Sequence, residues 1–405
     1  MNTILIVGAG GVSSVTAHKC AQLPQVFHKI HLASRTLSKC HLVAASVRQR
    51  TGREISTHHL DADNLDESIL LLRTLRPDLL LNLALPYQNL TLMEACLATG
   101  TSYLDTANYE PREIARFEYK WQWQYHERFR KQNLCALLGS GFDPGVTNVF
   151  TSFAAKHYFD EIVELDIVDV NGGENTESFA TNFNSEINIR EVSAVCRHWE
   201  NGQFVESPSF STHRTFSCPE GIGDFEIYRM YHEELESLTE AYPSLRRAQF
   251  WMSFSPTYLR NLKVLSNVGM TGIQPVDYRE KSVVPLQFLK SLLPDPGSLG
   301  ESTTGKTCIG CIIRGTKEEE HRTIYIYNSC SHESSFAETG SQAVSYTTGI
   351  PAMIGAKLML QGRWFEAGVW NMEHFDPDPF MEDLNTLGLP WSIEEHDPFL
   401  KANRP

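Results

Sequence analysis

The chain has 405 residues, of which 41% are hydrophobic and 21% charged, and its formal net charge is −14 at pH 7. This length suffices for two or three domains with separate cores, and the acidic balance argues against nucleic acid, whose phosphates require a basic surface. No segment approaches the roughly 20 consecutive apolar residues of a membrane helix, and the N-terminus lacks the pattern of a secretory signal, so we expect a cytoplasmic protein without a membrane partner.

The first predicted element is an apolar strand that leads through a glycine-rich turn into a helix. Residues 3–7 form the strand, residues 8–12 read GAGGV, and residues 15–23 suit a helix. This order lets a helix N-terminus face a pyrophosphate, so it predicts a dinucleotide site. The expected contacts are Gly8, Gly10, Gly11 and Val12. The third position of the G-x-G-x-x-G motif is Ser13, so the fingerprint alone is weak.

A second predicted strand, residues 29–33, ends in Ser34, Arg35 and Thr36. An NAD-binding fold places an Asp or Glu near this point, where it bonds the ribose 2′-hydroxyl. Here a guanidinium between two hydroxyls takes that place, and Arg suits a planar grip on a 2′-phosphate. The pattern favours NADP(H). The alternative is that Arg35 is a solvated residue at the start of the next helix.

Strands and helices continue to alternate up to residue 145. Strands are predicted at residues 55–60, 78–84, 102–105 and 134–138, and helices at 65–75, 89–98 and 111–131. Such alternation indicates a doubly wound parallel sheet, that is, a Rossmann domain over residues 1–145.

Open sheets of this kind bind ligands beyond the carboxyl ends of their strands. Asp61 and Ala62 follow the third strand and are candidates for adenine contact, although Asp61 could equally cap the next helix. Asn82 and Pro86 follow the fourth strand and are expected near the nicotinamide ribose, unless this segment is an ordinary turn. Asp105 ends the fifth strand and could bind an ammonium, join a proton path or cap a helix.

From about residue 146 the pattern changes to that of an α+β domain with a mixed sheet, which we place at residues 146–340. Residues 163–170 alternate between apolar and polar, as do residues 307–314 and 322–328, which predict a hairpin around a longer polar loop at 315–321. An amphipathic helix is predicted at residues 347–360. We expect the C-terminal segment, residues 341–405, to return to the first domain.

Two further patterns invite a functional interpretation. Cys308 and Cys311 have the spacing of a redox pair or of half a zinc site, but no second such pair exists and the segment suits a strand. Buried, unreactive thiols are the simpler interpretation, and no metal site is predicted. The run from His232 to Glu236 lacks the second histidine of a metalloprotease motif and suits a charged helix face that could offer a carboxylate to a cation.

Several segments together resemble the saccharopine dehydrogenase family over almost the whole chain. They are GAGGV, ASRT, NLALPY, YLDTA, GSGFDPG and PLQFLKSLLPDPGSLG with GKTCIG. The segment YRMYHEELESL, residues 228–238, is most similar to the carboxynorspermidine dehydrogenase branch of bacterial polyamine enzymes.

The resemblance implies an NADPH-dependent reductive condensation. L-Aspartate 4-semialdehyde would condense with 1,3-diaminopropane or putrescine, and hydride would reduce the imine to carboxynorspermidine or carboxyspermidine. It also implies a homodimer formed through the second domain. The alternatives are a saccharopine reductase or dehydrogenase of lysine metabolism and a non-catalytic NADP-binding protein on the same fold.

This chemistry requires cationic groups for the substrate carboxylate and acidic groups or π faces for the amine. By position and residue type, we expect Arg190 and Arg214 to bind the carboxylate. We expect Tyr103 and Glu233 to contact the amine, and Asp105 and Asp143 to be catalytic.

Overall fold

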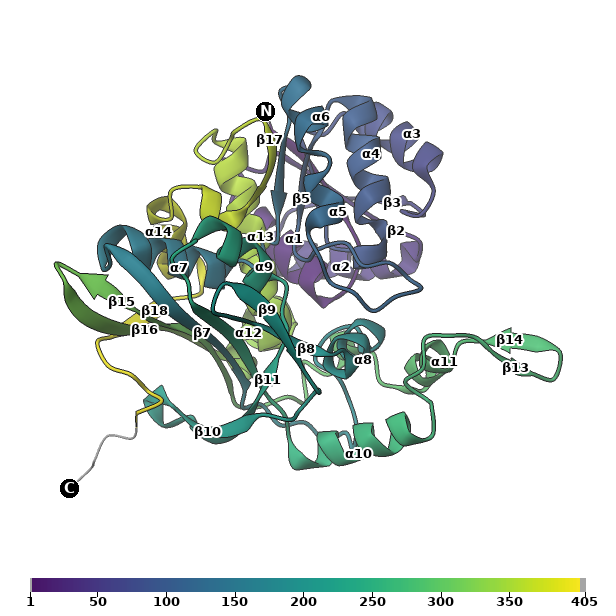
Figure 1. Ribbon diagram of the computed structural model, residues 1–405. Coiled ribbons are helices and arrows are strands. Elements are labelled where there is room, and N and C mark those ends of the chain that lie inside the picture. The colour runs from purple at the N-terminus through teal and green to yellow at the C-terminus, as the bar shows by residue number, and fades with distance from the viewer. Residues whose placement is uncertain (1, 401–405) are drawn as a thin grey trace.

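The computed structural model describes residues 2–400 and contains two large sheets (Figure 1). The first sheet has seven parallel strands in the order β17-β6-β5-β4-β1-β2-β3. This confirms the doubly wound α/β fold, in which parallel neighbours require crossover connections. The strands are β1 (Thr3–Val7), β2 (Lys29–Ser34), β3 (Ser56–His59), β4 (Leu79–Asn82), β5 (Ser102–Asp105), β6 (Cys135–Leu138) and β17 (Gly368–Asn371).

Helices cover both faces of this sheet and bury its strands. Ile4 and Ile6 of β1 pack into the core on one face, and Leu5 and Val7 pack into a separate core on the other. The alternation follows from the two-residue period of a strand. The helices that follow in this part of the chain are α1 (Gly11–Gln22), α2 (Leu37–Thr51), α3 (Leu65–Leu75), η1 (Pro86–Gln88), α4 (Asn89–Thr99), α5 (Lys120–Trp123) and α6 (His126–Lys131).

The single long helix expected over residues 111–131 is wrong. Residues 111–119 form turns and irregular structure, and only the short helices α5 and α6 follow. Tertiary contacts override the local helix propensity, because buried groups hold the irregular backbone. The amide N–H of Tyr119 donates to Glu236, and Arg190 donates to the carbonyl oxygens of Pro111, Arg112 and Ile114.

The second sheet is mixed and has nine strands, with the main path β10-β11-β12-β7-β15-β16-β18 and with β8 and β9 attached at β12. The β7–β12 pair is parallel and the other pairs are antiparallel. The strands are β7 (Glu161–Asn171), β8 (Cys196–Glu200), β9 (Gln203–Ser207), β10 (His213–Cys218), β11 (Gly223–Met230), β12 (Arg247–Ser253), β15 (Lys306–Lys317), β16 (Glu320–Ser331) and β18 (Trp391–Glu394).

The hairpin of β15 and β16 forms as expected, but the long loop expected at residues 315–321 is wrong. The strands stay paired up to Lys317 and Glu320, so Glu318 and Glu319 alone make the turn, with φ values of 52° and 66°. Positive φ at both central positions is the turn that matches the twist of a hairpin. The remaining helices are α7 (Val146–His157), α8 (Ser185–Ser193), η2 (Pro219–Gly221), α9 (Glu234–Ala241), α10 (Pro256–Asn267), α11 (Pro285–Leu292), η3 (Pro296–Ser298), α12 (His332–Thr339), α13 (Ala343–Leu360), η4 (Met372–His374) and α14 (Asp378–Leu387).

Helix α13 packs on the first domain as expected, but it is buried on nearly all sides and not on one face as an amphipathic helix would be. It packs on α1 and on strands of the first sheet, and it also contacts β15 and β16 of the second sheet. A Cβ at Gly349 would lie 2.7 Å from Cβ of Val15, and a Cβ at Gly355 would lie 2.4 Å from Oγ of Ser140. The two glycines therefore permit the close approach of α13 to the first domain.

The C-terminal segment divides between the two sheets. Strand β17 adds to the first sheet beside β6, but β18 pairs antiparallel with β16 of the second. The expectation that residues 341–405 return to the first domain is therefore wrong for β18, whose pairing covers an otherwise open sheet edge.

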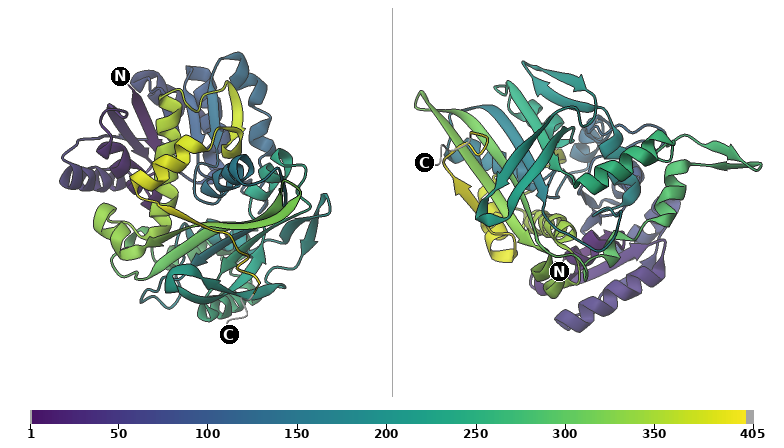
Figure 2. Two further views of the ribbon diagram at one scale, coloured as in Figure 1. Left: turned by 90° about the vertical axis from the view of Figure 1, so that its left-hand side faces the viewer. Right: turned by 90° about the horizontal axis from the view of Figure 1, so that it is seen from below.

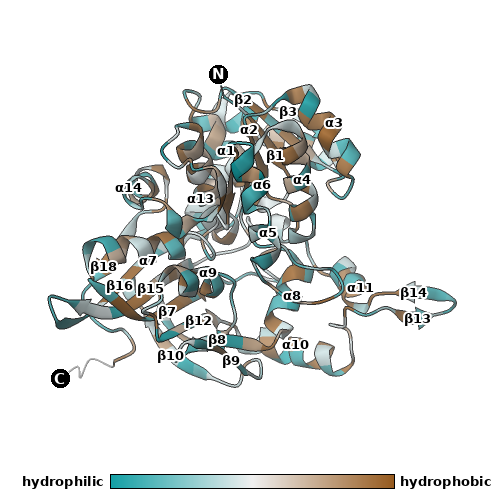
Figure 3. Cartoon of the chain, turned by 45° about the horizontal axis from the view of Figure 1, so that its top comes forward, coloured by the Kyte–Doolittle hydropathy of each residue, from teal (hydrophilic) through white to brown (hydrophobic). Residues whose placement is uncertain are grey.

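A thin arm projects from the second domain (Figures 1 and 2). It consists of the hairpin β13 (Val276–Tyr278) and β14 (Lys281–Val283), which follows α10 and precedes α11. Hydrophilic residues predominate along this hairpin, whereas hydrophobic residues line the strands of both large sheets (Figure 3). None of the helices within residues 2–400 is long and apolar enough to cross a membrane.

Candidate active site

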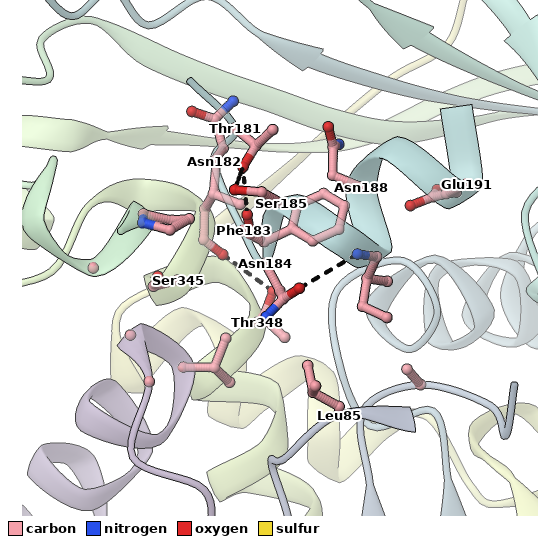
Figure 4. A pocket seen from close by; sticks show the side chains of 18 of the residues that line it. Leu85, Thr181, Asn182, Phe183, Asn184, Ser185, Asn188, Glu191, Ser345 and Thr348 are labelled. Atoms are coloured by element: carbon pink, nitrogen blue, oxygen red, sulfur yellow. Dashed lines mark hydrogen bonds between the residues drawn. The ribbon is translucent and has the colours of Figure 1, made fainter. Parts of the chain in front are cut away.

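A cavity of about 1060 Å³ lies between the two domains. Loops at the carboxyl ends of the first sheet form one wall, and α8 with the loop before it forms the other. Figure 4 shows Leu85 on the first wall and Asn184, Ser185 and Asn188 across the space from it. Its size and position are those of a ligand site at the open edge of an α/β sheet.

One end of the cavity has the features of a pyrophosphate site. Gly8 has a φ of +112°, and a Cβ there would lie 2.4 Å from the carbonyl oxygen of Leu83. At Gly10 a Cβ would meet nothing within 4 Å, so open space faces this residue. Helix α1 begins directly afterwards with no side-chain cap, which leaves its first N–H groups for an anion. Gly11 and Val12 also line the cavity.

Ser34, Arg35 and Thr36 line the same end of the cavity. The Arg35 side chain is 58% exposed and lies only loosely against carboxylates, 4.0 Å from Asp61 and 3.7 Å from Asp63. A phosphate could therefore engage it without breaking a close ion pair. Lys39, in the first turn of α2, also lines the cavity and was missed in the sequence; its Nζ lies 2.7 Å from Asp295.

The other expected nucleotide contacts divide into two groups. Ala62 and Pro86 line the cavity, whereas Asp61 and Asn82 do not. Asp61 does not cap α3 either, because Asn64 accepts the hydrogen bond from the N–H of Glu67. Asn82 is buried and holds the loop that lines the cavity, since its Oδ1 accepts from the N–H of Ala84 at 3.2 Å. Asn82 therefore does not make the direct cofactor contact that was expected from the sequence, but supports the loop that lines the cavity.

Tyr103 and Asp105 lie beneath the site and not in it. Asp105 is 1% exposed and accepts hydrogen bonds from the N–H of Gly139 at 2.8 Å and from Nε2 of Gln122 at 2.6 Å. Burial raises the pKa of Asp105 to about 7, against the effect of these donors. Tyr103 is fully buried, and its hydroxyl accepts from Nδ2 of Asn82. The expected catalytic and substrate contacts are therefore wrong for these two residues, because neither reaches the cavity.

Neither expected arginine is available for a substrate carboxylate. Arg190 on α8 is buried and forms an ion pair with Glu110 at 2.6 Å, and its remaining donors bond backbone carbonyl oxygens. Arg214 on β10 lies outside the cavity, with its guanidinium carbon 3.6 Å from the ring centroid of Phe399. Both arginines were expected to bind the carboxylate, but in the fold their guanidinium groups stabilise neighbouring parts of the protein.

The other end of the cavity is strongly acidic. Its side chains are contributed by β7, α8, the loop before α7 and the turn between β11 and α9. They are Asp143, Asp169, Glu191, His232 and Glu233, with Glu234 directly behind. Of the sequence-based candidates, Asp143 and Glu233 therefore lie in the cavity. Asp169, Glu191 and His232 were missed in the sequence. The regular alternation of apolar and polar residues along β7 breaks at Asp169, and this break was the available signal.

His232 holds this cluster together. Its ring stacks on Phe250 at a centroid distance of 4.3 Å, its Nδ1 bonds Glu234, and its Nε2 lies 3.3 Å from Glu191. Burial alone would lower the pKa of His232, but the surrounding carboxylates raise it well above its usual value. Burial raises the pKa of Glu233 to about 7. Within the described residues, no lysine or arginine forms an ion pair with these carboxylates.

Asn108 adds an unpaired polar group to the cavity wall. It is fully buried, and neither its Nδ2 nor its Oδ1 has a hydrogen-bond partner among the described residues. An unpaired buried amide costs about 1–3 kcal/mol, which a bound ligand would recover.

The Cys308 and Cys311 pair does not form a site. Both lie on β15, but Cys308 belongs to the core on one face of the sheet and Cys311 to the core on the other. The two thiols therefore point in opposite directions and cannot bridge. The described residues also contain no cluster of three or more side chains suited to a metal ion.

A Rossmann domain with a glycine turn, joined to a second domain across a cavity, is the arrangement of a dinucleotide-binding protein. Residues 4–137 match the saccharopine dehydrogenase NADP binding domain, and residues 141–389 match the saccharopine dehydrogenase C-terminal domain. The chain belongs to the saccharopine dehydrogenase family and is an NADP-dependent oxidoreductase.

Curated relatives match over nearly the full length. A carboxyaminopropylagmatine dehydrogenase from Synechocystis sp. is 53% identical over 98% of this chain and 99% of that protein. A carboxynorspermidine synthase from Vibrio alginolyticus is 40% identical over 98% of this chain and 97% of that protein. The apo saccharopine dehydrogenase (L-Glu forming) from Saccharomyces cerevisiae shares the fold, with a TM-score of 0.72 at 12% identity over 97% of this chain and all of that one.

Proposed function

We propose that this enzyme joins L-aspartate 4-semialdehyde to a polyamine precursor by NADPH-dependent reduction of their imine. The observation that carries this proposal is the acidic end of the cavity, whose carboxylates have no lysine or arginine partner within the described chain. Among residues 2–400, His232 is the one cation that faces these carboxylates, so the cluster keeps an excess of buried negative charge, and a cationic substrate relieves that cost.

The second substrate is an amine whose far end carries a positive charge. The acidic residues occupy one end of a long cavity, so they suit the distal cation while the near amine reacts beside the nicotinamide. The relative at 53% identity is named for a product of agmatine, which favours a guanidinium at that end. The relatives at 40% and 37% identity support the diamines expected from the sequence, and we rank agmatine first and 1,3-diaminopropane and putrescine second.

Neutral donors replace the arginines first expected at the carboxylate. Asn184 and Asn188 line the cavity on the α8 wall (Figure 4). The Oδ1 of Asn188 accepts from the hydroxyl of Tyr258 at 2.6 Å, and the Oδ1 of Asn184 caps α8. Their Nδ2 groups therefore remain as donors for the α-carboxylate of the semialdehyde.

A saccharopine-forming reaction is the alternative expectation, and the cavity charges weigh against it. Such substrates carry additional carboxylates and would require additional cations near the reacting atoms. The lysines and arginine that line the cavity are Arg35 and Lys39 at the nucleotide end and Lys290, which is paired with Glu186 at 3.0 Å. The acidic end would repel a dicarboxylic amino acid.

NADPH absorbance with product mass spectrometry tests this function. We expect NADPH consumption only with the semialdehyde and an amine together, and a carboxylated product of matching mass. Butylamine, which has putrescine's chain without its second charge, should react poorly because it leaves the acidic end unpaired. Saccharopine formed from lysine and 2-oxoglutarate, or from aminoadipate semialdehyde and glutamate, would refute the proposal.

We further infer that two copies of the chain associate through the projecting arm. Val276 and Tyr278 of its hairpin are 50% and 60% exposed, and Phe288 and Leu292 at its base are 52% and 65% exposed. A two-stranded hairpin is marginally stable alone, and exposed apolar groups of this kind mark interfaces. Light scattering should report a dimer, and Tyr278→Asp with Phe288→Asp should convert it to a monomer. A wild-type monomer would contradict this inference.

A further inference from the structure

Two carboxyl groups from different elements meet at the acidic end of the cavity. Asp143 lies in the loop between β6 and α7, and Asp169 lies near the end of β7 on the face that looks toward the cavity. Both side chains line this end of the cavity together with His232 and Glu191, and both are partly open to it. A hydrogen bond from Asp143 acts on the pKa of Asp169. A contact between two carboxyl groups requires one of them to carry a proton.

The surroundings indicate which group holds that proton. Burial, followed by the charge of Asp169, raises the pKa of Asp143 well above its usual value. Burial raises the pKa of Asp169 to about 7, while the charge of His232 and the bond from Asp143 act in the opposite direction. Glu191 of α8 and Glu234 of α9 also face the pair and raise both pKa values. At neutral pH, Asp143 is therefore the donor, and Asp169 is poised between its two forms.

We propose that Asp143 and Asp169 act as a proton-sharing pair that converts the aldehyde and the amine to the iminium before hydride transfer. This proposal rests on the proposed function and adds to it the groups that move protons. Acid and base catalysis is most effective when the pKa lies near the working pH, which describes Asp169.

The pair balances the protons of condensation. Ionised Asp169 takes a proton from the substrate ammonium, and the freed nitrogen pair forms the C–N bond while the carbonyl π pair moves to oxygen. That oxygen takes the proton of Asp143, and the ionised Asp143 then removes a proton from the nitrogen. The hydroxyl leaves as water with the proton held by Asp169, and the nitrogen pair forms the C=N⁺ bond. Both carboxyl groups return to their starting states, and NADPH when bound supplies the hydride.

Other titratable groups are less suited to this role. Asp105 lies outside the cavity. Both ring nitrogens of His232 already face carboxylates, Glu191 on one side and Glu234 on the other, so this residue positions the cluster. Asp143 and Asp169 combine access to the cavity with a contact that holds one proton between them.

Two near-isosteric variants test the pair. Asp143→Asn keeps a donor toward Asp169 but cannot release its proton, and Asp169→Asn keeps an acceptor but cannot take one. We expect each to lower kcat/KM for the amine by about 100-fold or more while circular dichroism and NADPH affinity stay unchanged. Asp66→Asn, at an exposed position in the first turn of α3 outside the cavity, is the matched control and should behave as wild type.

An isotope effect separates catalysis from packing. With NADPH deuterated at the transferred position, the isotope effect on kcat/KM should fall toward 1 in both variants, because condensation becomes the slow step. A calorimetric titration of amine into NADPH-free enzyme at pH 7, in buffers of different ionisation enthalpy, should show proton release from wild type that is lost in Asp169→Asn. If both variants lose rate but keep a full isotope effect, or if Asp169→Asn releases as many protons as wild type, the proposal is overturned. Failure of wild type to form any carboxylated product would instead refute the proposed function.

Discussion

Replacement of Arg35 by alanine tests the placement of the 2′-phosphate. A hydrogen bond to a charged group contributes about 1.5–3 kcal/mol. The Arg35 side chain is 58% exposed, which places its contribution in the lower half of that range. Lys39 remains in the first turn of α2, where it pairs with Asp295, but Asp61 and Asp63 lose the cation that faces them and repel the phosphate. We expect a loss of about 1.5–2 kcal/mol, which is roughly a 12- to 30-fold weaker Kd for NADPH.

Calorimetric titration with both cofactors measures this effect. The Kd for NADH should change by less than about twofold, because NADH lacks the 2′-phosphate that Arg35 is expected to bind. Arg48→Ala is the matched control, since Arg48 is an exposed arginine of α2 that pairs with Glu54 away from the cavity. If Arg35→Ala weakens NADH and NADPH equally, or weakens neither, the phosphate does not lie at Arg35.

Three further predictions follow from the site. Gly10→Val should abolish NADPH binding in calorimetry while circular dichroism stays native, because its side chain would occupy the open space expected for the pyrophosphate. NADPH binding by folded Gly10→Val would contradict this. Gly8→Ala should instead destabilise the fold, because φ is +112° there and a Cβ would contact a backbone oxygen. Arg190→Ala should lower the free energy of unfolding in urea by about 3 kcal/mol or more, because it leaves buried Glu110 unpaired, and an unchanged midpoint would contradict that structural role. Amine affinity should rise as pH increases through about 7, because Asp169 then loses its proton and attracts the cation. Calorimetry between about pH 6 and 8 measures this affinity, and a fall in affinity with rising pH would contradict the prediction.

Much of the first domain was determined by the sequence itself. The strand, glycine turn and helix at residues 3–22 form with Gly8 at a positive φ, and the helix predicted at residues 65–75 is α3 with the same bounds. Both depend on local rules, since a backbone with positive φ in a tight turn favours glycine, and apolar residues that recur at helical spacing predict a helix. The NADP(H) preference inferred from Arg35 agrees with the NADP-binding domain that residues 4–137 match.

Residue type suggested Asp143 and Glu233 as candidates, but only the tertiary structure assembled the acidic end of the site. Asp143, Asp169 and His232 are far apart in the sequence, and only the parallel β7–β12 pairing and the packing of α7 on the second sheet bring them to one cavity. For the same reason, Arg190 and Asp105 appeared to be functional but became buried supports. Residue type specifies what a side chain can do, whereas burial and the charges that surround it decide whether it meets a ligand or holds the fold together.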